Sequence, residues 1–409
     1  MEKTPQILEL EKALGIQLKQ DITYGNYGFE LNSKNEITKL QVFSLTQEKF
    51  DTLAAFPFLQ QLEFLSIESS TQVSDFSGLR HFTNLQSLSL MSCNLSTLPD
   101  VLTELPLIDI NLTRNKLKDI SFLAKLPNLQ GLNLRLNPLN SVEPLLGLKQ
   151  LKKLNLDDTN AKDTLSILPQ LTTLEDLSIE IKLNTLDWIT PLTNLQVLCA
   201  TNQIVDIKPL AHLTKLKNLR LDNNNIEEIT ALQHCKNLEK ISLTYNQIKD
   251  ISPLAHLTAL KSISLFKNEI ADITALQHCK NLETLWIGSN KIADITALVH
   301  LSALKDLSLD NNNISAISVL QHCKQLEKLS LADNQIVDVS PLTTLERLKN
   351  LSLQNNRLQD FTPLYQLKNL ESLALGSWFS IPADYQSIWT KMTHTDKPQS
   401  QTISDYYDR

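Results

Sequence analysis

The sequence is poor in the features on which several classes of site depend. Only 8 of its 409 residues are glycine, so glycine-rich linkers and phosphate-binding loops are not expected. No uninterrupted apolar stretch approaches the 18 or so residues that a membrane-spanning helix requires. We therefore expect a protein that has neither a glycine-rich nucleotide site nor a membrane span.

Basic charge is also scarce. Lysine and arginine number 38 against 45 acidic residues, which gives a net charge of −7 and an isoelectric point near 5.7. Proteins that bind nucleic acid usually carry a basic surface, so this balance argues against a nucleic-acid partner. The first twenty residues contain Glu2, Glu9 and Glu11 and no apolar core of 7–15 residues, unlike a secretory signal. We expect a cytoplasmic protein that does not bind membranes.

The five cysteines do not form an obvious disulfide framework, because their number is odd. Cys235, Cys279 and Cys323 lie 44 residues apart, at a position that elsewhere holds leucine. Strand spacing would place cysteines two repeats apart at a separation of roughly 10 Å, which is too far for a disulfide bond. Cys93 is also expected inside, and Cys199 on a strand. We expect reduced thiols that pack as small apolar side chains.

What the sequence does have is one phrase, L-x-x-L-x-L-x-x-N-x-I-x-D-I, that returns with a 22-residue period. One copy consists of Leu260, Ile263, Leu265, Asn268, Ile270, Asp272 and Ile273. The first leucine of the phrase falls at positions 62, 85, 107, 129, 151, 174, 195, 216, 238, 260, 282, 304, 326, 348 and 370. A fixed period of 20–29 residues with this leucine pattern predicts a leucine-rich repeat solenoid. We expect an α/β fold with a curved parallel sheet on the concave face and short helical turns on the convex face.

The interior of each repeat can be predicted from its alternation. In the stretch 261–265, Ile263 and Leu265 are expected to point inward, while Ser262, Ser264 and the following Phe266 face the concave surface. The asparagine that follows is expected to bond the backbone of its own and the neighbouring loop, and so to form a ladder. Its members are Asn224, Asn246, Asn268, Asn290, Asn312, Asn334 and Asn356.

A solenoid exposes a core edge at both ends and therefore needs caps. We expect an N-terminal helical cap with opening strands at residues 1–61, about 14 repeats at 62–376, a C-terminal cap at 377–392 and a disordered tail at 393–409. Thr4 and Pro5 are typical of a helix start. The stretch 157–205 is irregular, because Thr159 and Lys182 replace the ladder asparagine. A functional kink and a tolerated relic remain equal alternatives for it.

The 22-residue unit with Asn-x-Ile-x-Asp-Ile-x-Pro-Leu resembles the internalin-type leucine-rich repeats of bacterial proteins. It is also similar to the leucine-rich regulatory subunit of protein phosphatase 1. The resemblance covers about residues 62–376 and implies recognition of a protein on the concave face. The signal peptide and wall-anchoring tail of secreted internalins are not visible here, and only a short segment follows the repeats. No catalytic residue of a ligase domain is therefore carried over.

Six histidines recur in register, one in each of six successive repeats, at His212, His234, His256, His278, His300 and His322. A metal-binding or pH-sensing ladder is one explanation, since imidazole binds zinc and titrates near neutral pH. Duplication of a 44-residue super-repeat is the other and the favoured one, because a straight ladder cannot converge four ligands. The adjacent histidine–cysteine pairs lack an orienting carboxylate. We expect no metal, no cofactor and no catalysis.

Three aromatics interrupt the mostly polar concave face on successive repeats, and exposed aromatics are enriched in interface hot spots. The predicted partner-binding residues are Tyr245, Phe266 and Trp286, with Arg220, Asp222, Asp306 and Asp310 around them. The alternatives are that these aromatics occur by chance or that Tyr245 packs on a neighbouring loop. We expect a non-enzymatic, monomeric protein–protein interaction scaffold. The alternative is a regulatory or targeting subunit of a separate enzyme, such as a phosphatase or a ubiquitin ligase.

Overall fold

The computed structural model describes residues 3–22, 26–159, 161–180 and 184–375. The chain divides into two compact units: Met1–Ile181 with Asp187–Ala200, and Lys182–Leu186 with Thr201–Arg409. This division falls within the stretch that the sequence marks as irregular. The expected C-terminal cap (377–392) and tail (393–409) lie outside the described residues, so those domain boundaries stay predictions.

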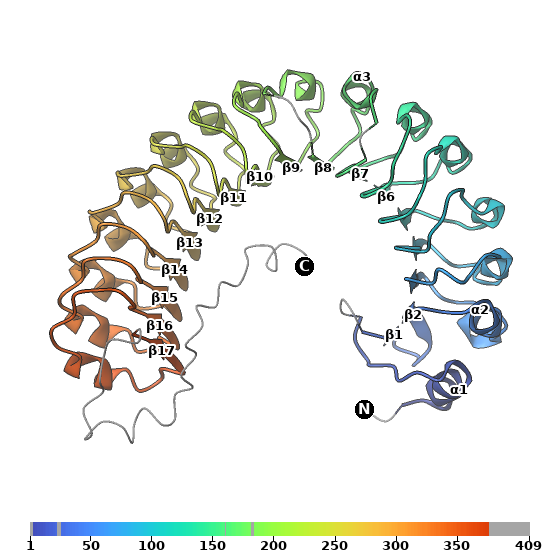
Figure 1. Cartoon of the computed structure of the whole chain (residues 1–409), viewed down its shortest axis with the longest axis horizontal. Helices are drawn as coiled ribbons and strands as arrows, with labels where there is room; N and C mark the ends of the chain where they lie inside the picture. The colour runs from blue at the N-terminus through green and yellow to red at the C-terminus, as the bar shows by residue number, and fades with distance from the viewer. Residues whose placement is uncertain (1–2, 23–25, 160, 181–183, 376–409) are drawn as a thin grey trace. The chain divides into compact units, whose positions relative to one another are not determined.

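In each unit the strands lie along the inner side of an arc and the short helical turns lie along its outer side (Figure 1). The first unit holds β1 (Gly28–Leu31), β2 (Ile37–Phe43), β3 (Phe64–Glu68), β4 (Ser87–Ser89), β5 (Asp109–Asn111), β6 (Gly131–Asn133), β7 (Lys153–Asn155), β8 (Asp176–Glu180) and most of β9 (Val197–Thr201). The second unit holds β10 (Asn218–Arg220), β11 (Lys240–Ser242), β12 (Ser262–Ser264), β13 (Thr284–Trp286), β14 (Asp306–Ser308), β15 (Lys328–Ser330), β16 (Asn350–Ser352) and β17 (Ser372–Ala374).

Neighbouring strands pair in parallel at an offset of one repeat. In the second unit Ile241 lies opposite Ile263, which lies opposite Leu285, and all three are buried. Ser262 lies opposite Thr284 on the other face. Among the described strands, β1 and β2 pair antiparallel and open the first unit. The prediction of a parallel leucine-rich repeat sheet, with Ile263 and Leu265 inside, is confirmed.

The asparagine ladder is also confirmed. Asn268 Nδ2 donates to the carbonyl oxygens of Leu243 (2.9 Å) and Leu265 (3.0 Å), and its Oδ1 accepts from the amide of Ile248 (3.0 Å). Each asparagine thus satisfies buried backbone groups in its own repeat and in the preceding one. In the first unit Cys93 takes the ladder position and donates from Sγ to the Ile67 carbonyl at 2.9 Å.

The outer side consists mainly of single 3₁₀ turns, as a 22-residue unit predicts. They are η1 (Pro57–Leu59), η2 (Ser77–His81), η3 (Asp100–Glu104), η4 (Ser121–Lys125), η5 (Glu143–Gly147), η6 (Leu168–Gln170), η7 (Asp187–Ile189), η8 (Lys208–His212), η9 (Thr230–His234), η10 (Ser252–His256), η11 (Thr274–His278), η12 (Thr296–His300), η13 (Ser318–His322), η14 (Ser340–Thr344) and η15 (Thr362–Gln366). The aspartate of the repeated phrase starts these turns: Asp272 Oδ1 accepts from the Thr274 amide at 2.8 Å.

Three α-helices occur in the described residues, α1 (Pro5–Leu14), α2 (Gln47–Ala54) and α3 (Thr164–Ile167), all in the first unit. Thr4 caps α1 by accepting from the Ile7 amide, and Pro5 is its first residue, as predicted. The apolar face of α1 is buried, and the helix packs against α2. This burial supports the predicted N-terminal cap, whose protective role stays a prediction.

One residue after the strand region of nearly every repeat adopts a left-handed backbone conformation. From β10 onward these residues have φ between 52° and 58° and are Asn223, Tyr245, Lys267, Ser289, Asn311, Asp333 and Asn355. Asparagine and aspartate tolerate this conformation because their short polar side chains bond locally, whereas bulky residues do not. Bulky side chains nevertheless occupy this position at Arg114, Leu136 and Lys267 as well as at Tyr245.

Among the described residues, no helix combines the length and the apolar character that crossing a bilayer demands. All five cysteines carry free thiols. Burial raises the pKa of Cys235, Cys279 and Cys323 to about 11, so these thiols stay protonated at neutral pH. The prediction of unpaired packing cysteines is confirmed.

Candidate protein-binding surface

The three predicted aromatic residues all lie in the second unit. They lie on the face of the sheet that is opposite the core, or at the edge of that face. Trp286 is the last residue of β13 and stands between the buried Leu285 and Ile287, so its side chain is directed away from the core. Trp286 and Phe266 are half-buried, and Tyr245 is 42% exposed. We call these three residues the aromatic surface.

Two of the three rings touch each other. Tyr245 and Phe266 pack edge to face, with ring centroids 5.8 Å apart and an interplanar angle of 67°. The ammonium nitrogen of Lys267 lies 4.6 Å from the centroid of the Tyr245 ring. The alternative that Tyr245 packs on a neighbouring loop is therefore correct in part, because Phe266 and Lys267 belong to the next repeat. The ring nevertheless keeps a large exposed fraction.

The third ring is anchored by a carboxylate. Trp286 Nε1 donates to Asp306 Oδ1 at 3.1 Å, and Asp306 Oδ2 lies 3.8 Å from Lys328 Nζ. Burial raises the pKa of Asp306, while the bond from Trp286 and the charge of Lys328 act in the opposite direction. Asp306 therefore orients the indole of Trp286, although its own carboxylate is partly desolvated, which disfavours its charged form.

Glycine makes room for Phe266. A Cβ atom at Gly288 would stand 3.2 Å from Cδ2 of Phe266 and 3.0 Å from the carbonyl oxygen of Asp310. Both distances are tighter than ordinary van der Waals contact, so the ring rests where a side chain would otherwise project. Gly288 occupies the same position of its repeat as Phe266 does one repeat earlier.

The two aspartates at this repeat position are committed to bonds within the unit. Asp222 has a side chain that is 4% exposed, and it accepts from Arg220 Nε (2.8 Å), Ser242 Oγ (2.5 Å) and the Thr244 amide (2.8 Å). These bonds fasten one repeat to the next. Arg220, at 34% exposed, is the more accessible member of the ion pair.

Asp310 repeats this arrangement four repeats further on. It accepts from Ser308 Oγ at 2.8 Å, from the Ala332 amide at 2.9 Å and from the Ser330 hydroxyl. Its position on the polar face is as predicted, and its oxygens bond the following repeat. A role of Asp222 or Asp310 in partner binding stays a prediction.

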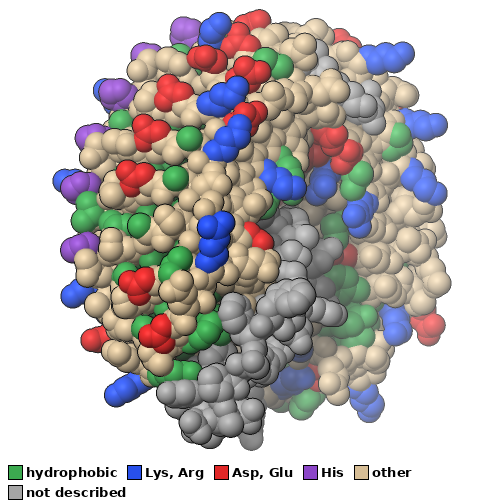
Figure 2. All heavy atoms as spheres, turned by 60° about the vertical axis from the view of Figure 1, so that its left-hand side comes forward, with side chains coloured by type: hydrophobic (Ala, Val, Ile, Leu, Met, Phe, Trp, Pro, Cys, Tyr) green, Lys and Arg blue, Asp and Glu red, His purple; other side chains and the backbone are tan. Residues whose placement is uncertain are grey.

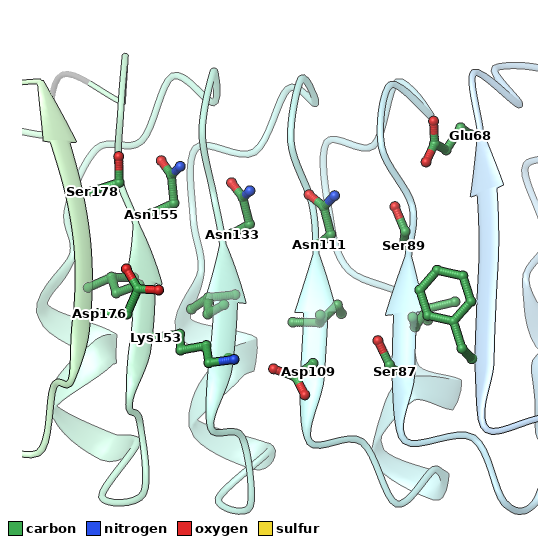
Figure 3. A pocket seen from close by; sticks show the side chains of 16 residues that line it. Glu68, Ser87, Ser89, Asp109, Asn111, Asn133, Lys153, Asn155, Asp176 and Ser178 are labelled. Carbon is green, nitrogen blue, oxygen red and sulfur yellow. The ribbon is translucent and has the colours of Figure 1, made fainter. Parts of the chain in front are cut away.

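A second feature lies on the inner face of the first unit, where the sequence analysis placed no site. It is an open hollow of about 380 Å³, and we call it the polar hollow (Figure 3). Its polar lining consists of Glu68, Ser87, Ser89, Asp109, Asn111, Asn133, Lys153, Asn155, Asp176 and Ser178. Gly131 forms its floor on β6, and Phe64 lines it from β3.

Comparisons with known proteins bear on the repeats first. The family described as leucine rich repeats (two copies) matches residues 193–234, 214–256, 236–278, 258–300, 280–322, 302–344 and 324–366. A solved structure of an internalin (inlF) from Listeria monocytogenes is similar to the chain, with 28% sequence identity and a TM-score of 0.56. The match covers 86% of this chain and 92% of the internalin. The chain is an internalin-like leucine-rich repeat protein.

Two further proteins resemble this leucine-rich repeat protein. A leucine-rich repeat protein of Leptospira interrogans has 26% identity and a TM-score of 0.68, covering 91% of this chain and 99% of that chain. Among curated proteins, leucine-rich repeat-containing G-protein coupled receptor 5 of Rattus norvegicus is 29% identical over 201 residues. That match covers 47% of this chain and 22% of the receptor, so the chain spans about a fifth of that curated relative.

Internalin-like leucine-rich repeat proteins are protein-interaction scaffolds, and such families are generally non-enzymatic. The comparisons do not show the expected similarity to the phosphatase 1 subunit, which stays a prediction. They also leave the cytoplasmic location, the monomeric state and the absence of a nucleic-acid partner as predictions.

The six histidines that recur in register lie on the outer side of this leucine-rich repeat protein and are all exposed. Figure 2 shows histidine side chains in a line along one edge of the visible face. In the part of the chain that the structure describes, no three side chains of histidine, cysteine, aspartate or glutamate come close enough together to hold a metal ion. The absence of a bound metal or cofactor stays a prediction.

Sequence reasoning missed three contributors to these surfaces. The sequence did not predict the contact of Lys267 with the Tyr245 ring or the contact of Phe266 with Gly288. It did not predict the polar hollow either. A signal existed for Gly288, because the chain has few glycines and this one stands at a position that otherwise holds a side chain. The hollow has a similar signal in Gly131, which is the first residue of a strand.

Proposed function

We propose that the protein is a non-enzymatic interaction scaffold that binds a protein partner on the concave face of its second unit, as a monomer in the cytoplasm. Tyr245, Phe266 and Trp286 would serve as anchors. The flanking Arg220 and the predicted Asp222, Asp306 and Asp310 would set the charge pattern around them. The observation that carries the proposal is that three large aromatics stay partly in water on successive repeats of an otherwise polar face.

Tyr245 occupies a left-handed position, as the equivalent residue of nearly every repeat does. Placing a bulky residue there costs about 1–2 kcal/mol. Its ring contact with Phe266 is worth about 0.5–1.5 kcal/mol, and the Lys267 contact about 0.5–1 kcal/mol. These contributions offset the strain, so tyrosine brings little net gain for folding. Because Arg114, Leu136 and Lys267 share this position, the strain is a property of the repeat. The exposure of the Tyr245 ring is what supports a binding role.

The position of the rings also fits an interface. Hot-spot residues are enriched in tryptophan, tyrosine and arginine, and they sit where a rigid surface holds them. The hydrogen bond to Asp306 fixes the orientation of the Trp286 indole, and close packing against Gly288 fixes the Phe266 ring. A partner would therefore meet pre-oriented rings and lose little side-chain entropy on ordering them.

The alternative is that the partner is itself an enzyme, so that the chain acts as a regulatory or targeting subunit of a phosphatase or ubiquitin ligase. The same aromatic surface would serve both roles. Co-purification of the full chain, followed by mass identification of what it retains, separates them. An enzyme bound through the aromatic surface supports the subunit role, and a non-enzymatic protein supports the plain scaffold.

The test of the binding surface is the double variant Phe266→Ser and Trp286→Ser. Serine is what many other repeats carry on this face, so the fold should persist. The retained partner should bind about 10-fold more weakly or worse, since truncated hot spots cost about 2 kcal/mol or more. Gln354→Ser, on the same face and also half-buried, is the matched control and should bind normally. Undiminished binding by a folded double variant would place the partner site elsewhere.

A further inference from the structure

We propose that the first unit carries a second recognition site, the polar hollow, which binds an extended peptide segment containing lysine or arginine. This site is independent of the aromatic surface, since every residue that lines it belongs to the first unit. Its chemistry also differs, because it offers amide donors and carboxylates in place of aromatic rings.

The donors are three asparagines that stand in a row on β5, β6 and β7 (Figure 3). The side-chain oxygens of Asn111, Asn133 and Asn155 accept from the backbone amide two residues further on, at 3.0, 3.0 and 2.9 Å. A backbone N–H can only donate, so the oxygen of each side chain must face it. The Nδ2 group of each asparagine is therefore turned the other way.

These Nδ2 groups have no hydrogen-bond acceptor among the described residues. They follow one another at about the 4.8 Å strand spacing, each held in place by its own oxygen. They differ from the ladder asparagines, whose Nδ2 groups bond carbonyls inside the repeat. A fixed row of unused donors is complementary to a row of acceptors, and the carbonyl oxygens of an extended peptide form such a row.

A buried hydroxyl at the end of the row points to the same conclusion. Ser89, on β4 beside Asn111, is 6% exposed, and its Oγ has no hydrogen-bond partner within the described part of the chain. Leaving a buried polar group without a hydrogen-bond partner destabilises the folded chain. Ser89 lines the hollow, so a small shift on ligand binding would give this hydroxyl a partner.

The charges of the hollow select a cation. Glu68, Asp109 and Asp176 line it against one basic residue, Lys153, which leaves an excess of two negative charges. Burial raises the pKa of Asp176, and the described structure gives its carboxylate no hydrogen bond, while the charge of Lys153 acts against the shift. A basic side chain placed beside Asp176 would relieve this desolvation.

Gly131 makes room for the Asp109 carboxylate in the middle of the hollow. Lys153 and Asp109 point toward one another in front of β6 (Figure 3). A Cβ atom at Gly131 would run into the Asp109 carboxylate, so any side chain there would displace this carboxylate. The hollow of about 380 Å³ falls within the range of roughly 300–1,000 Å³ typical of ligand pockets.

The experiment is a selection from displayed random dodecapeptides on the purified full chain, run in parallel on Gly131→Val. Valine suits a strand, and the group it displaces is the mobile end of Asp109, so this variant should fold. We expect the wild-type chain to enrich peptides rich in lysine or arginine, and the variant to lose them. Synthetic peptides from the wild-type pool should bind Gly131→Val at least 10-fold more weakly.

A second variant, Asn133→Leu, removes one donor without adding charge and should also weaken these peptides. Asn350→Leu, an exposed asparagine on β16 in the second unit, is the control and should bind them normally. Thermal melts followed by circular dichroism establish whether each variant is folded. If Asn133→Leu does not fold, the result for Gly131→Val alone tests the proposal. The proposal is overturned if no peptide is enriched, if acidic peptides are enriched, or if both hollow variants bind as the wild type does.

Discussion

The ring of Phe266 rests against Gly288 in the next repeat, where a Cβ atom would lie 3.2 Å from Cδ2 of the ring. The aromatic surface therefore depends on the absence of a side chain as well as on the presence of three. This relationship allows the surface to be perturbed without removing any aromatic group.

Gly288→Ala should displace the Phe266 ring and weaken partner binding, while the fold is retained. Overpacking costs about 1–3 kcal/mol, and replacing glycine returns about 0.4–1 kcal/mol through the unfolded chain. A urea denaturation midpoint should therefore fall only slightly. Ala332→Gly changes the same repeat position away from the rings and should leave binding unchanged. A normal affinity for Gly288→Ala would show that the orientation of Phe266 is unimportant.

Tyr245→Asn should leave the stability of the folded chain within about 1 kcal/mol of the wild type, because relief of the left-handed strain offsets the lost ring contacts. Asn223 and Asn311 show that asparagine is accepted at this position of the repeat. Urea denaturation and partner affinity should be measured together. A loss of stability above about 2 kcal/mol, the size expected for truncating a core side chain, would instead identify Tyr245 as a structural residue.

Asp306→Asn should alter the pH dependence of stability. Burial raises the pKa of Asp306 above its ordinary value of 3.8, so the folded chain binds this proton more tightly than the unfolded chain does. The wild type therefore gains stability from this group as pH falls through the raised pKa, and loses it as pH rises. The variant has no such carboxyl, and its amide oxygen can still accept from Trp286.

The variant should accordingly match or exceed the wild type at pH 7 and lose that advantage toward pH 4. Denaturation midpoints at both pH values test this expectation. A variant that is markedly less stable at pH 7 would mean that the Lys328 contact outweighs the desolvation of Asp306.

Asp222→Ala should destabilise the second unit by about 2 kcal/mol or more, because the buried amide of Thr244 and the hydroxyl of Ser242 would lose their acceptor. Asp310→Ala should show a comparable loss, since Asp310 accepts from the Ala332 amide in the same way. Thermal melts measure both. Full stability of either variant would free that aspartate for the partner-binding role predicted from the sequence.

Periodicity sufficed to predict the fold because each strand repeats the same inward pair, such as Ile263 and Leu265, and the same ladder residue, such as Asn268. The candidate site was harder to predict. The alternation of the strand places Asp222 on the polar face. The following repeat buries its side chain, and this burial cannot be predicted from the sequence of one repeat. Likewise, the Nδ2 group of Asn133 faces the hollow because the Oδ1 atom of the same side chain accepts from the Arg135 amide. Only the folded chain brings that amide into place.

The ladder has a consequence for how the length of the second unit can vary. Each ladder asparagine reaches a carbonyl 25 residues earlier and receives an amide 20 residues earlier, and these separations recur at Asn246, Asn268 and Asn290. Insertion or deletion of one whole 22-residue unit reconnects every one of these bonds with an equivalent one. A change of another length must leave the aligned strand and ladder positions in place, as in the first unit, where 23 residues separate Leu62 from Leu85 and Cys93 Sγ still reaches the Ile67 carbonyl. The number of strands on the inner face can therefore change only by whole repeats, and the separation between any two features of that face is a whole number of strand spacings.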